Sequence, residues 1–411
     1  MHYDMIIVGG GLVGAGLAIA LKETPLRIAL IDARMPLNED PRLFALNYSS
    51  CHFLMNLGLW PQLKPHAAPI KQVHVSNQGY FGAVRLQSTE IDLDSLGHVI
   101  PAKIIEAALN DELMKMSGDP ASPFDLYRPA TLKSLHPQEG MVTLQVTAAG
   151  EQKELKAPLV IGADGAESTV RAQLNIPTQK IDYDQSALVC RITLQRSHRA
   201  IAYERFNAKG AIAMLPLIGN ECAMIWTSDK HTITALSALS DEDFLQALQK
   251  EFGYRLGRLQ RTTQRFSFPL QMIRAEKMVE QGVLLLGNSA HTLHPIAAQG
   301  FNLALYEVAI LVDMIKALQT KQAFLELDLE KMTKHIQHQQ TVSLGFSHRL
   351  SNLFSHDSFM VNSILQLGMM GLDVVSPIKK QFVKKMLFQK GTMPQLLLST
   401  DDYEKIAKTG Y

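Results

Sequence analysis

Two histidines three residues apart, His291 and His294, lie in the stretch "LLLGNSAHTLHPIAAQGFNLAL" at residues 284–305. Imidazoles are common zinc ligands, so a metal site has to be considered. The stretch also passes from an apolar run through Gly287 and small polar residues to a proline, a glycine and a second apolar run. That order is typical of a strand, a turn and a helix, whose first N–H groups can hold a phosphate. These residues alone leave both kinds of site open.

The flanking elements favour the turn. "GVLLLGN" predicts a buried strand, and "QGFNLALYEVAILVDMIKAL" predicts a helix. Pro295 and small residues lie between them, so both histidines fall in an irregular segment rather than on one helix face. No carboxylate or cysteine lies close by in the sequence to complete a zinc shell. We therefore predict a ligand-holding turn and no metal site.

The amino-terminal segment "YDMIIVGGGLVGAGLAIAL" predicts a strand, a glycine turn and a helix. Gly9, Gly11 and Gly14 form GxGxxG, in which the glycines permit a tight turn, close approach of a pyrophosphate and close packing of the helix. Asp32 ends the next apolar strand, 18 residues after Gly14, near the spacing of a ribose-binding carboxylate. A dinucleotide site is the favoured interpretation.

A signal peptide or membrane helix is the alternative for this segment, because Met5–Leu21 is an uncharged run of 17 residues. The preceding "MHYD" carries an acid and neither Lys nor Arg, which is atypical of a signal peptide. Five glycines would also weaken a helix.

A third strand–turn–helix pattern lies at residues 157–174, "APLVIGADGAESTVRAQL". Asp164 and Gly165 form the turn, Ser168 can cap the helix, and Arg171 lies one turn into it. An ordinary structural turn is equally compatible with this segment alone.

In this order and spacing, the three segments resemble the FAD-dependent aromatic hydroxylases with the para-hydroxybenzoate hydroxylase fold, over about residues 1–340. The ubiquinone-biosynthesis branch has the hallmark "GDAAHxxHPxxGQGxNLG", where this chain has "GNSAHTLHPIAAQGFNLAL". Asn288 replaces the family's Asp, as in the branch acting on 2-polyprenyl-6-methoxyphenol, which "DPRLFALNYSSCHFLMNLGLW" also resembles. Ala298 and Ala304 replace glycines of the hallmark.

The resemblance implies non-covalent FAD and no metal. The implied cofactor-binding residues are Gly9, Gly11, Gly14, Asp32, Arg42, Asp164, Gly165, Arg171, Gly287, Asn288, Pro295, Gln299, Gly300, Phe301 and Asn302. The flavin-facing turn would comprise His294, Pro295, Gln299 and Gly300, with the helix N-terminus toward the electron-rich end of the ring. No side chain is assigned as a catalytic acid or base.

The predicted fold class is α/β: a Rossmann-like FAD-binding domain with an inserted mixed β-sheet substrate domain and a helical C-terminal tail. We expect the FAD domain at residues 1–69, 98–178 and 270–340, the substrate domain at 70–97 and 179–269, and the tail at 341–411. Four strand-like runs, "SALVCRITL", "AIAYERF", "GAIAMLPL" and "ECAMIWTS", mark the inserted sheet. Phe206, Met214, Pro216 and Trp226 are candidate pocket-lining residues, with ordinary sheet core as the alternative.

The implied activity is monooxygenation of a hydrophobic prenylated phenol in ubiquinone biosynthesis, with O₂, NADPH or NADH, and a flavin hydroperoxide. Another flavin oxidoreductase of this fold, such as an epoxidase or prenyl reductase, and a flavin-binding scaffold protein are the alternatives. The net charge of +1 disfavours nucleic acid as a partner.

Three widely spaced cysteines suit a reducing, cytoplasmic location. Lys379, Lys380, Lys384 and Lys385 lie among apolar residues of the tail. Such a face either packs on the body or lies on an anionic membrane, so association with the inner-membrane surface or a multi-enzyme complex is a further expectation.

Overall fold

A computed structural model describes residues 1–35, 41–80, 82–207, 209–292, 299–318, 324, 327–334, 336–337, 379–380 and 393–399. One layer is a six-stranded sheet in the order β19-β20-β12-β1-β2-β8. Its strands are β1 (Met5–Val8), β2 (Ile28–Ile31), β8 (Phe124–Tyr127), β12 (Leu159–Gly162), β19 (Val279–Glu280) and β20 (Val283–Leu285). Every neighbouring pair except β19–β20 is parallel. The runs are almost wholly apolar, as expected of parallel strands buried on both faces.

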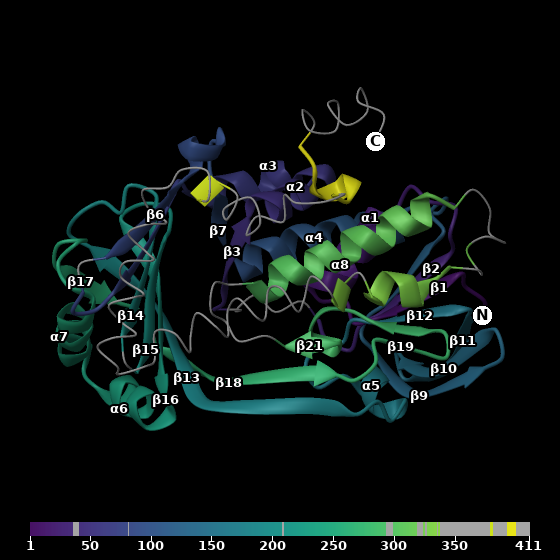
Figure 1. Cartoon of the computed structure of the whole chain (residues 1–411). Helices are drawn as coiled ribbons and strands as arrows, with labels where there is room; N and C mark the ends of the chain where they lie inside the picture. The colour runs from purple at the N-terminus through teal and green to yellow at the C-terminus, as the bar shows by residue number, and fades with distance from the viewer. Residues whose placement is uncertain are drawn as a thin grey trace.

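Three helices, α1 (Leu12–Ala20), α4 (Ala102–Gly118) and α8 (Gln299–Lys316), lie side by side over this sheet (Figure 1). An antiparallel sheet of β9 (Ala130–Gln138), β10 (Met141–Ala148) and β11 (Glu151–Ala157) adds its buried face to the same apolar core. The helix α5 (Thr169–Gln173) follows β12. These elements place the turns after β1, β12 and β20 around one core.

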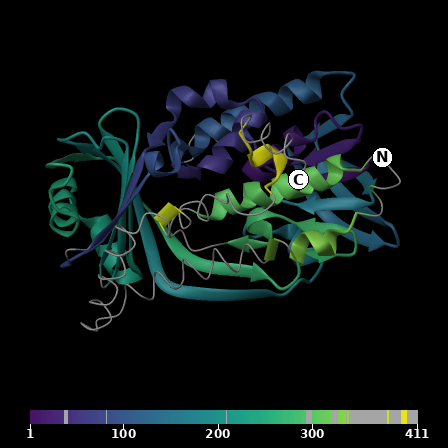
Figure 2. The ribbon, with the colours of Figure 1, turned by 45° about the horizontal axis from the view of Figure 1, so that its top comes forward.

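A second large sheet has the order β21-β18-β13-β16-β15-β14-β5-β6, with β17 paired to β13. Its strands are β5 (Gln72–Asn77), β6 (Ala83–Gln87), β13 (Thr178–Leu194), β14 (Ile201–Asn207), β15 (Gly210–Pro216), β16 (Glu221–Asp229), β17 (Leu259–Thr262), β18 (Phe266–Ala275) and β21 (His291–Thr292). Figures 1 and 2 show the long strands β13 and β18 running from this sheet toward the parallel sheet. The α/β fold class with an inserted mixed sheet is confirmed; the predicted domain boundaries stay a prediction.

The two faces of the second sheet have different neighbours. Helices α6 (Lys230–Ala238) and α7 (Asp241–Phe252) cover one face, where Met214 and Trp226 are buried with Phe244 in one apolar cluster. These two residues are therefore sheet core and not pocket lining. Phe206 points to the opposite face, because side chains alternate along a strand.

A third sheet, β3-β7-β4, packs against that opposite face. It consists of β3 (Leu43–Asn47), β4 (Ala68–Ile70) and β7 (Gly97–Pro101), and it lies next to α2 (Tyr48–Asn56) and α3 (Trp60–Leu63). The layer of the parallel sheet and the second sheet thus meet through β3, β4 and β7.

Most of the predicted helical tail lies outside the described residues, including Lys384 and Lys385. Lys379 is 4% exposed, and its Nζ lies 2.7 Å from Glu90 Oε1. The Asn56 side chain donates to the carbonyls of Leu396 and Leu398. These described parts of the tail pack on the body. No described helix is both long enough and apolar enough to span a bilayer.

Candidate functional site

The turn after β1 depends on the absence of side chains at two glycines. Gly9 has a φ of +107°, and a Cβ on it would lie 2.3 Å from the Ala163 carbonyl oxygen. A Cβ on Gly14 would lie 1.9 Å from the Gly9 carbonyl oxygen. At Gly11, by contrast, the nearest atom is Arg34 Nη2 at 3.9 Å, so this position is open. Helix α1 begins there without a side-chain cap, which leaves N–H groups available to an anionic ligand.

Asp32 lies at the end of β2 in an ion pair that the sequence pattern does not reveal. Its Oδ2 is 3.1 Å from Arg128 Nη2, and both side chains are almost buried. Arg128 is the residue directly after β8, and its guanidinium also donates to Asn110 Oδ1 at 2.7 Å. A Cβ on Gly10 would lie 2.6 Å from Asp32 Oδ2, so the pair fits only beside a glycine. Arg128 was missed because β8 follows β2 by some ninety residues and becomes its neighbour only in the sheet.

The second turn follows β12. Asp164 Oδ2 accepts a hydrogen bond from the Val170 N–H at 3.1 Å, and Ser168 caps α5 as predicted by accepting from the Arg171 N–H. Gly165 has a φ of +92°, which favours glycine. The Arg171 guanidinium donates to the Ser289 carbonyl at 2.8 Å, so this residue ties the second turn to the third.

The third turn follows β20 and is held by a buried carboxylate. Glu307 on α8 is fully buried; its Oε2 accepts from the Gly287 N–H at 3.0 Å, and its Oε1 accepts from His291 Nε2. No carboxylate lies close to His291 in the sequence, but the fold brings one next to it. Glu307 lies on α8, 16 residues after His291, and the two side chains meet in the folded chain.

These two groups do not make a metal centre. Among the described residues, no three His, Cys, Asp or Glu side chains converge on a point that could hold a metal ion. His294 and Pro295 lie outside the described residues, as does Ala298. Asn288 is exposed beside the third turn, so its amide is accessible to a ligand.

Helix α8 begins at Gln299 next to β3. Asn302 is buried, accepts from the Asn47 N–H at 2.9 Å and donates to the Ala45 carbonyl at 3.0 Å. The Phe301 and Phe44 rings lie 4.6 Å apart between centroids, and the Arg42 guanidinium lies over Phe44 at 5.7 Å. The structure therefore brings Arg42 close to the start of α8, although some 260 residues separate them. A Cβ on Gly300 would meet no atom within 4 Å.

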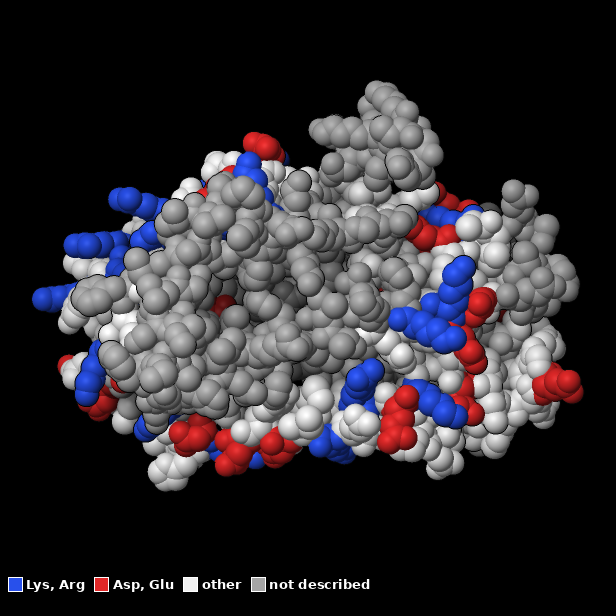
Figure 3. All heavy atoms as spheres, viewed as in Figure 1, with Lys and Arg blue, Asp and Glu red and all other residues white. Residues whose placement is uncertain are grey.

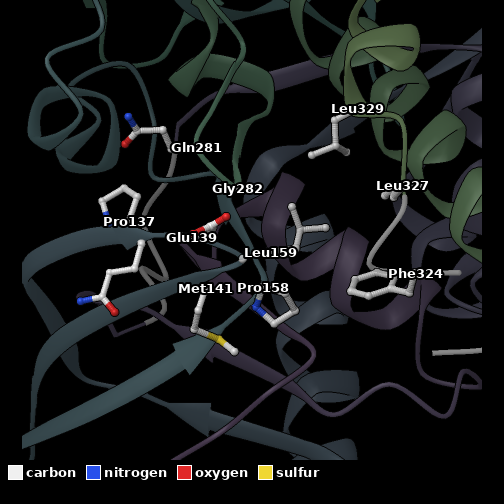
Figure 4. A pocket seen from close by; sticks show the side chains of 12 residues that line it. Pro137, Glu139, Met141, Pro158, Leu159, Gln281, Gly282, Phe324, Leu327 and Leu329 are labelled. Carbon is white, nitrogen blue, oxygen red and sulfur yellow. The ribbon is translucent and has the colours of Figure 1, made fainter. Parts of the chain in front are cut away.

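A cavity of about 670 Å³ lies elsewhere, at the amino-terminal end of β12 (Figure 4). Its lining is largely apolar and includes Met141, Pro158, Leu159, Phe324, Leu327 and Leu329. The three turns described above follow the carboxyl ends of parallel strands, which is where α/β sheets bind their ligands. This cavity is therefore separate from the candidate site.

The residues present fit FAD. The three turns follow β1, β12 and β20, which are adjacent parallel strands. Asp164 Oδ1 and Arg128 Nε are buried and have no hydrogen-bond partner among the described residues. Buried polar groups are normally paired, so two such atoms beside the turns are compatible with contacts that a bound dinucleotide completes.

Comparison with known proteins identifies the family. The FAD binding domain family matches residues 2–330. The chain is 30% identical to a ubiquinone hydroxylase, UbiL, of Rhodospirillum rubrum, over 93% of this chain and 88% of that protein. This protein is an FAD-binding monooxygenase.

Further relatives place this monooxygenase among the ubiquinone-biosynthesis hydroxylases. It is 26% identical to 3-demethoxyubiquinol 3-hydroxylase of Escherichia coli, over 93% of this chain and 97% of that enzyme. Its fold is similar to that of p-nitrophenol 4-monooxygenase PnpA from Pseudomonas putida, with a TM-score of 0.74 at 14% identity, covering 93% and 98% of the two chains.

The glycine geometry predicts opposite effects for two alanine substitutions. Gly14→Ala should lower the free energy of unfolding by about 1–3 kcal/mol or prevent folding, because the methyl group overlaps the Gly9 carbonyl. Gly11→Ala should change the free energy of unfolding by less than about 0.5 kcal/mol, because no protein atom lies close to the new methyl group. It should weaken FAD binding, because the methyl group would lie where the ligand approaches the backbone. Chemical denaturation of the apoprotein and FAD titration separate the two effects. Equal stability of both variants would contradict the close contact at Gly14.

Asp32→Ala should weaken FAD binding by about 1.5–3 kcal/mol, the range for a hydrogen bond to a charged group. The substitution also deprives Arg128 of its carboxylate, so Asp32→Ala/Arg128→Met is the matched control. If Asp32 contacts the ribose, the double variant binds FAD no more tightly than the single one in a fluorescence titration. Recovery of wild-type affinity in the double variant would mean that Asp32 only neutralises Arg128.

Proposed function

We propose that this protein hydroxylates the aromatic ring of a prenylated phenol in ubiquinone biosynthesis, with O₂ as co-substrate and NADPH or NADH as electron donor. Two of the similar proteins named above are ubiquinone hydroxylases and align over more than nine-tenths of this chain. The convergence of three turns on the carboxyl edge of β1, β12 and β20 is the structural observation that carries the proposal.

The proposed roles of the chain's residues follow from their places. Gly9, Gly11 and the start of α1 would hold the pyrophosphate, Asp32 the adenosine ribose, and Asn288 the ribityl region. The start of α8, from Gln299 to Asn302, would face the electron-rich side of the flavin ring and stabilise negative charge there. When bound and reduced, FAD supplies the activated oxygen atom, and the protein orients the phenol and excludes water.

An assay of the purified holoprotein tests the function. A 2-methoxyphenol with one prenyl unit should increase NAD(P)H oxidation, and the product should gain one oxygen atom by mass spectrometry. EDTA should leave the rate unchanged, because the proposed chemistry uses no metal. Bound FAD without turnover would favour the scaffold alternative. Oxidation or reduction confined to the prenyl chain would favour an epoxidase or prenyl reductase, and restoration of an EDTA-treated enzyme by a metal would overturn the metal-free site.

Association with an anionic membrane surface is part of the proposal, and a loop cluster at one end of the second sheet supports it. Hydrogen bonds join the loops, including Arg196 N–H to the Leu256 carbonyl at 3.0 Å. The exposed arginines of the cluster are Arg196, Arg199, Arg255 and Arg258. Two large apolar side chains project beside them, Tyr254 at 67% and Ile218 at 56% exposure. In Figure 3, Lys and Arg side chains project from the left edge, whereas charges of both signs mix along the lower edge.

Exposed arginines next to an aromatic and an aliphatic side chain are typical of surfaces that contact anionic lipids. The full-length protein should therefore co-sediment with phosphatidylglycerol vesicles but not with phosphatidylcholine vesicles. Arg255→Ala/Arg258→Ala should reduce this binding about thirtyfold, at about 1 kcal/mol per charge. Lys133→Ala/Lys180→Ala removes the same charge from two exposed positions elsewhere and should not. Equal binding by both double variants would refute this surface.

A further inference from the structure

A stripe of partly exposed residues crosses the second sheet on the face opposite α6 and α7. Its members are successive Cα partners in the ladders: Val75, Glu204, Ala213, Ile225, Val189 and Phe266. The adjacent row lies two residues along each strand. Asn77, Phe206, Ala211, Thr227 and Ala187 of this row are buried, whereas Phe268 at its end is 36% exposed. Ladder partners share a face, so the stripe is a continuous apolar strip with one carboxyl group.

This face lies toward the layer of the parallel sheet and its helices. Ala202 and Phe206, the neighbours of Glu204 along β14, are buried in one apolar cluster with Val99 of β7. Ala45 of β3 packs against the same cluster, and its carbonyl accepts the hydrogen bond from Asn302 at the start of α8. One packed layer therefore separates the stripe's flank from the helix that would face the flavin.

Glu204 is unusual in this setting. No hydrogen bond or ion pair of its carboxyl group occurs with any residue that the structure describes, and its ladder partners Val75 and Ala213 are apolar. Burial alone raises the pKa of Glu204 to about 7. The residue is nevertheless only partly buried, so it lies at the edge of the apolar surface and not deep in the core.

Among the described residues, few other charges face this carboxyl group. Arg191 of β13 is on the same face, but β15 and β16 lie between its strand and that of Glu204. Its Cα partner on β16 is Ala223, whose own partner on β15 is Leu215. Tyr48 of α2 packs against the apolar cluster, and the His52 ring lies 4.4 Å from the Tyr48 ring between centroids. An isolated carboxylate next to apolar surface costs free energy unless a ligand pairs with it, and such groups cluster at functional sites.

We propose that Glu204 binds the ring hydroxyl of the phenolic substrate and accepts its proton, and that the apolar residues of the stripe hold part of the prenyl chain. This inference rests on the proposed function. The O–H bond breaks as the proton moves to the Glu204 carboxylate, and the electron pair enters the ring. The ring carbon then forms its new bond to one oxygen atom of O₂. The other oxygen atom leaves as water, formed with the two electrons and the hydrogen of NAD(P)H and one proton from solvent. The ring carbon loses its own proton, which the new hydroxyl takes up, and the Glu204 proton returns to the phenol oxygen.

The test combines binding with a pH profile. The probes are the 2-methoxyphenol with one prenyl unit and its methyl ether, which lacks the hydroxyl proton. Their dissociation constants are measured for the holoprotein from the change in FAD absorbance. The wild type should bind the phenol roughly 10- to 100-fold more tightly than the ether, and Glu204→Leu should remove this preference. Glu204→Gln can still accept a hydrogen bond but cannot take a proton.

The hydroxylation rate of the wild type should rise with pH with a midpoint near 7, because the carboxylate is the acceptor. In Glu204→Gln the rate should fall by about 100-fold, and the rise should disappear. Glu221→Gln, which alters another carboxyl group on the same sheet face, is the control and should retain the wild-type profile. FAD content and thermal unfolding verify that the variants fold.

A phenol preference and pH profile unchanged in both Glu204 variants would overturn the inference while leaving the proposed function intact. If the wild type hydroxylates no phenol, the proposed function fails. The binding comparison between phenol and ether still reports on Glu204 in that case, so the two failures are distinguishable.

Discussion

The parallel pairing of β20 with β12 and of β12 with β1 is the constraint on which the site depends. In this register Ile161 pairs with Ile7 on one side and Leu284 on the other, which brings the carboxyl ends of three strands to one edge. The turns that follow are far apart in the sequence but adjacent in space. The apolar residues of these strands, fully buried in one core, fix this order by their burial. Without the pairing, the glycine turn, Asp164 and Gly287 would have no common ligand.

Polar side chains then fix the turns relative to one another. Glu307 reaches from α8 to the backbone of Gly287 and to His291, while Arg171 reaches from α5 to the Ser289 carbonyl. Asn302 joins the start of α8 to β3. Each of these groups is buried, so loss of a partner would leave an uncompensated polar atom in the core. Two residues implied as cofactor ligands, Arg171 and Asn302, thus also have clear architectural contacts.

The local patterns were predictable because they depend on short-range geometry. GxGxxG, the cap at Ser168 and the four strands of the inserted sheet follow from turn chemistry and residue alternation. Arg128 and Glu307 were not predictable, because the order of strands and the folding back of the third turn bring them to the site. Met214 and Trp226 illustrate a further limit: alternation shows that they share a face, but not that α6 and α7 cover it. The segment 293–298, with His294 and Pro295, lies outside the described residues, so the flavin-facing turn there stays a prediction.

The fate of the oxygen atoms tests the central claim most directly. The purified holoprotein is supplied with ¹⁸O₂, NAD(P)H and the prenylated 2-methoxyphenol in ordinary water, and the phenol is analysed by mass spectrometry. The account predicts one ¹⁸O atom in a new ring hydroxyl for each product molecule. Product whose new oxygen comes from water, or ¹⁸O found only in hydrogen peroxide while the ring stays unchanged, would contradict it.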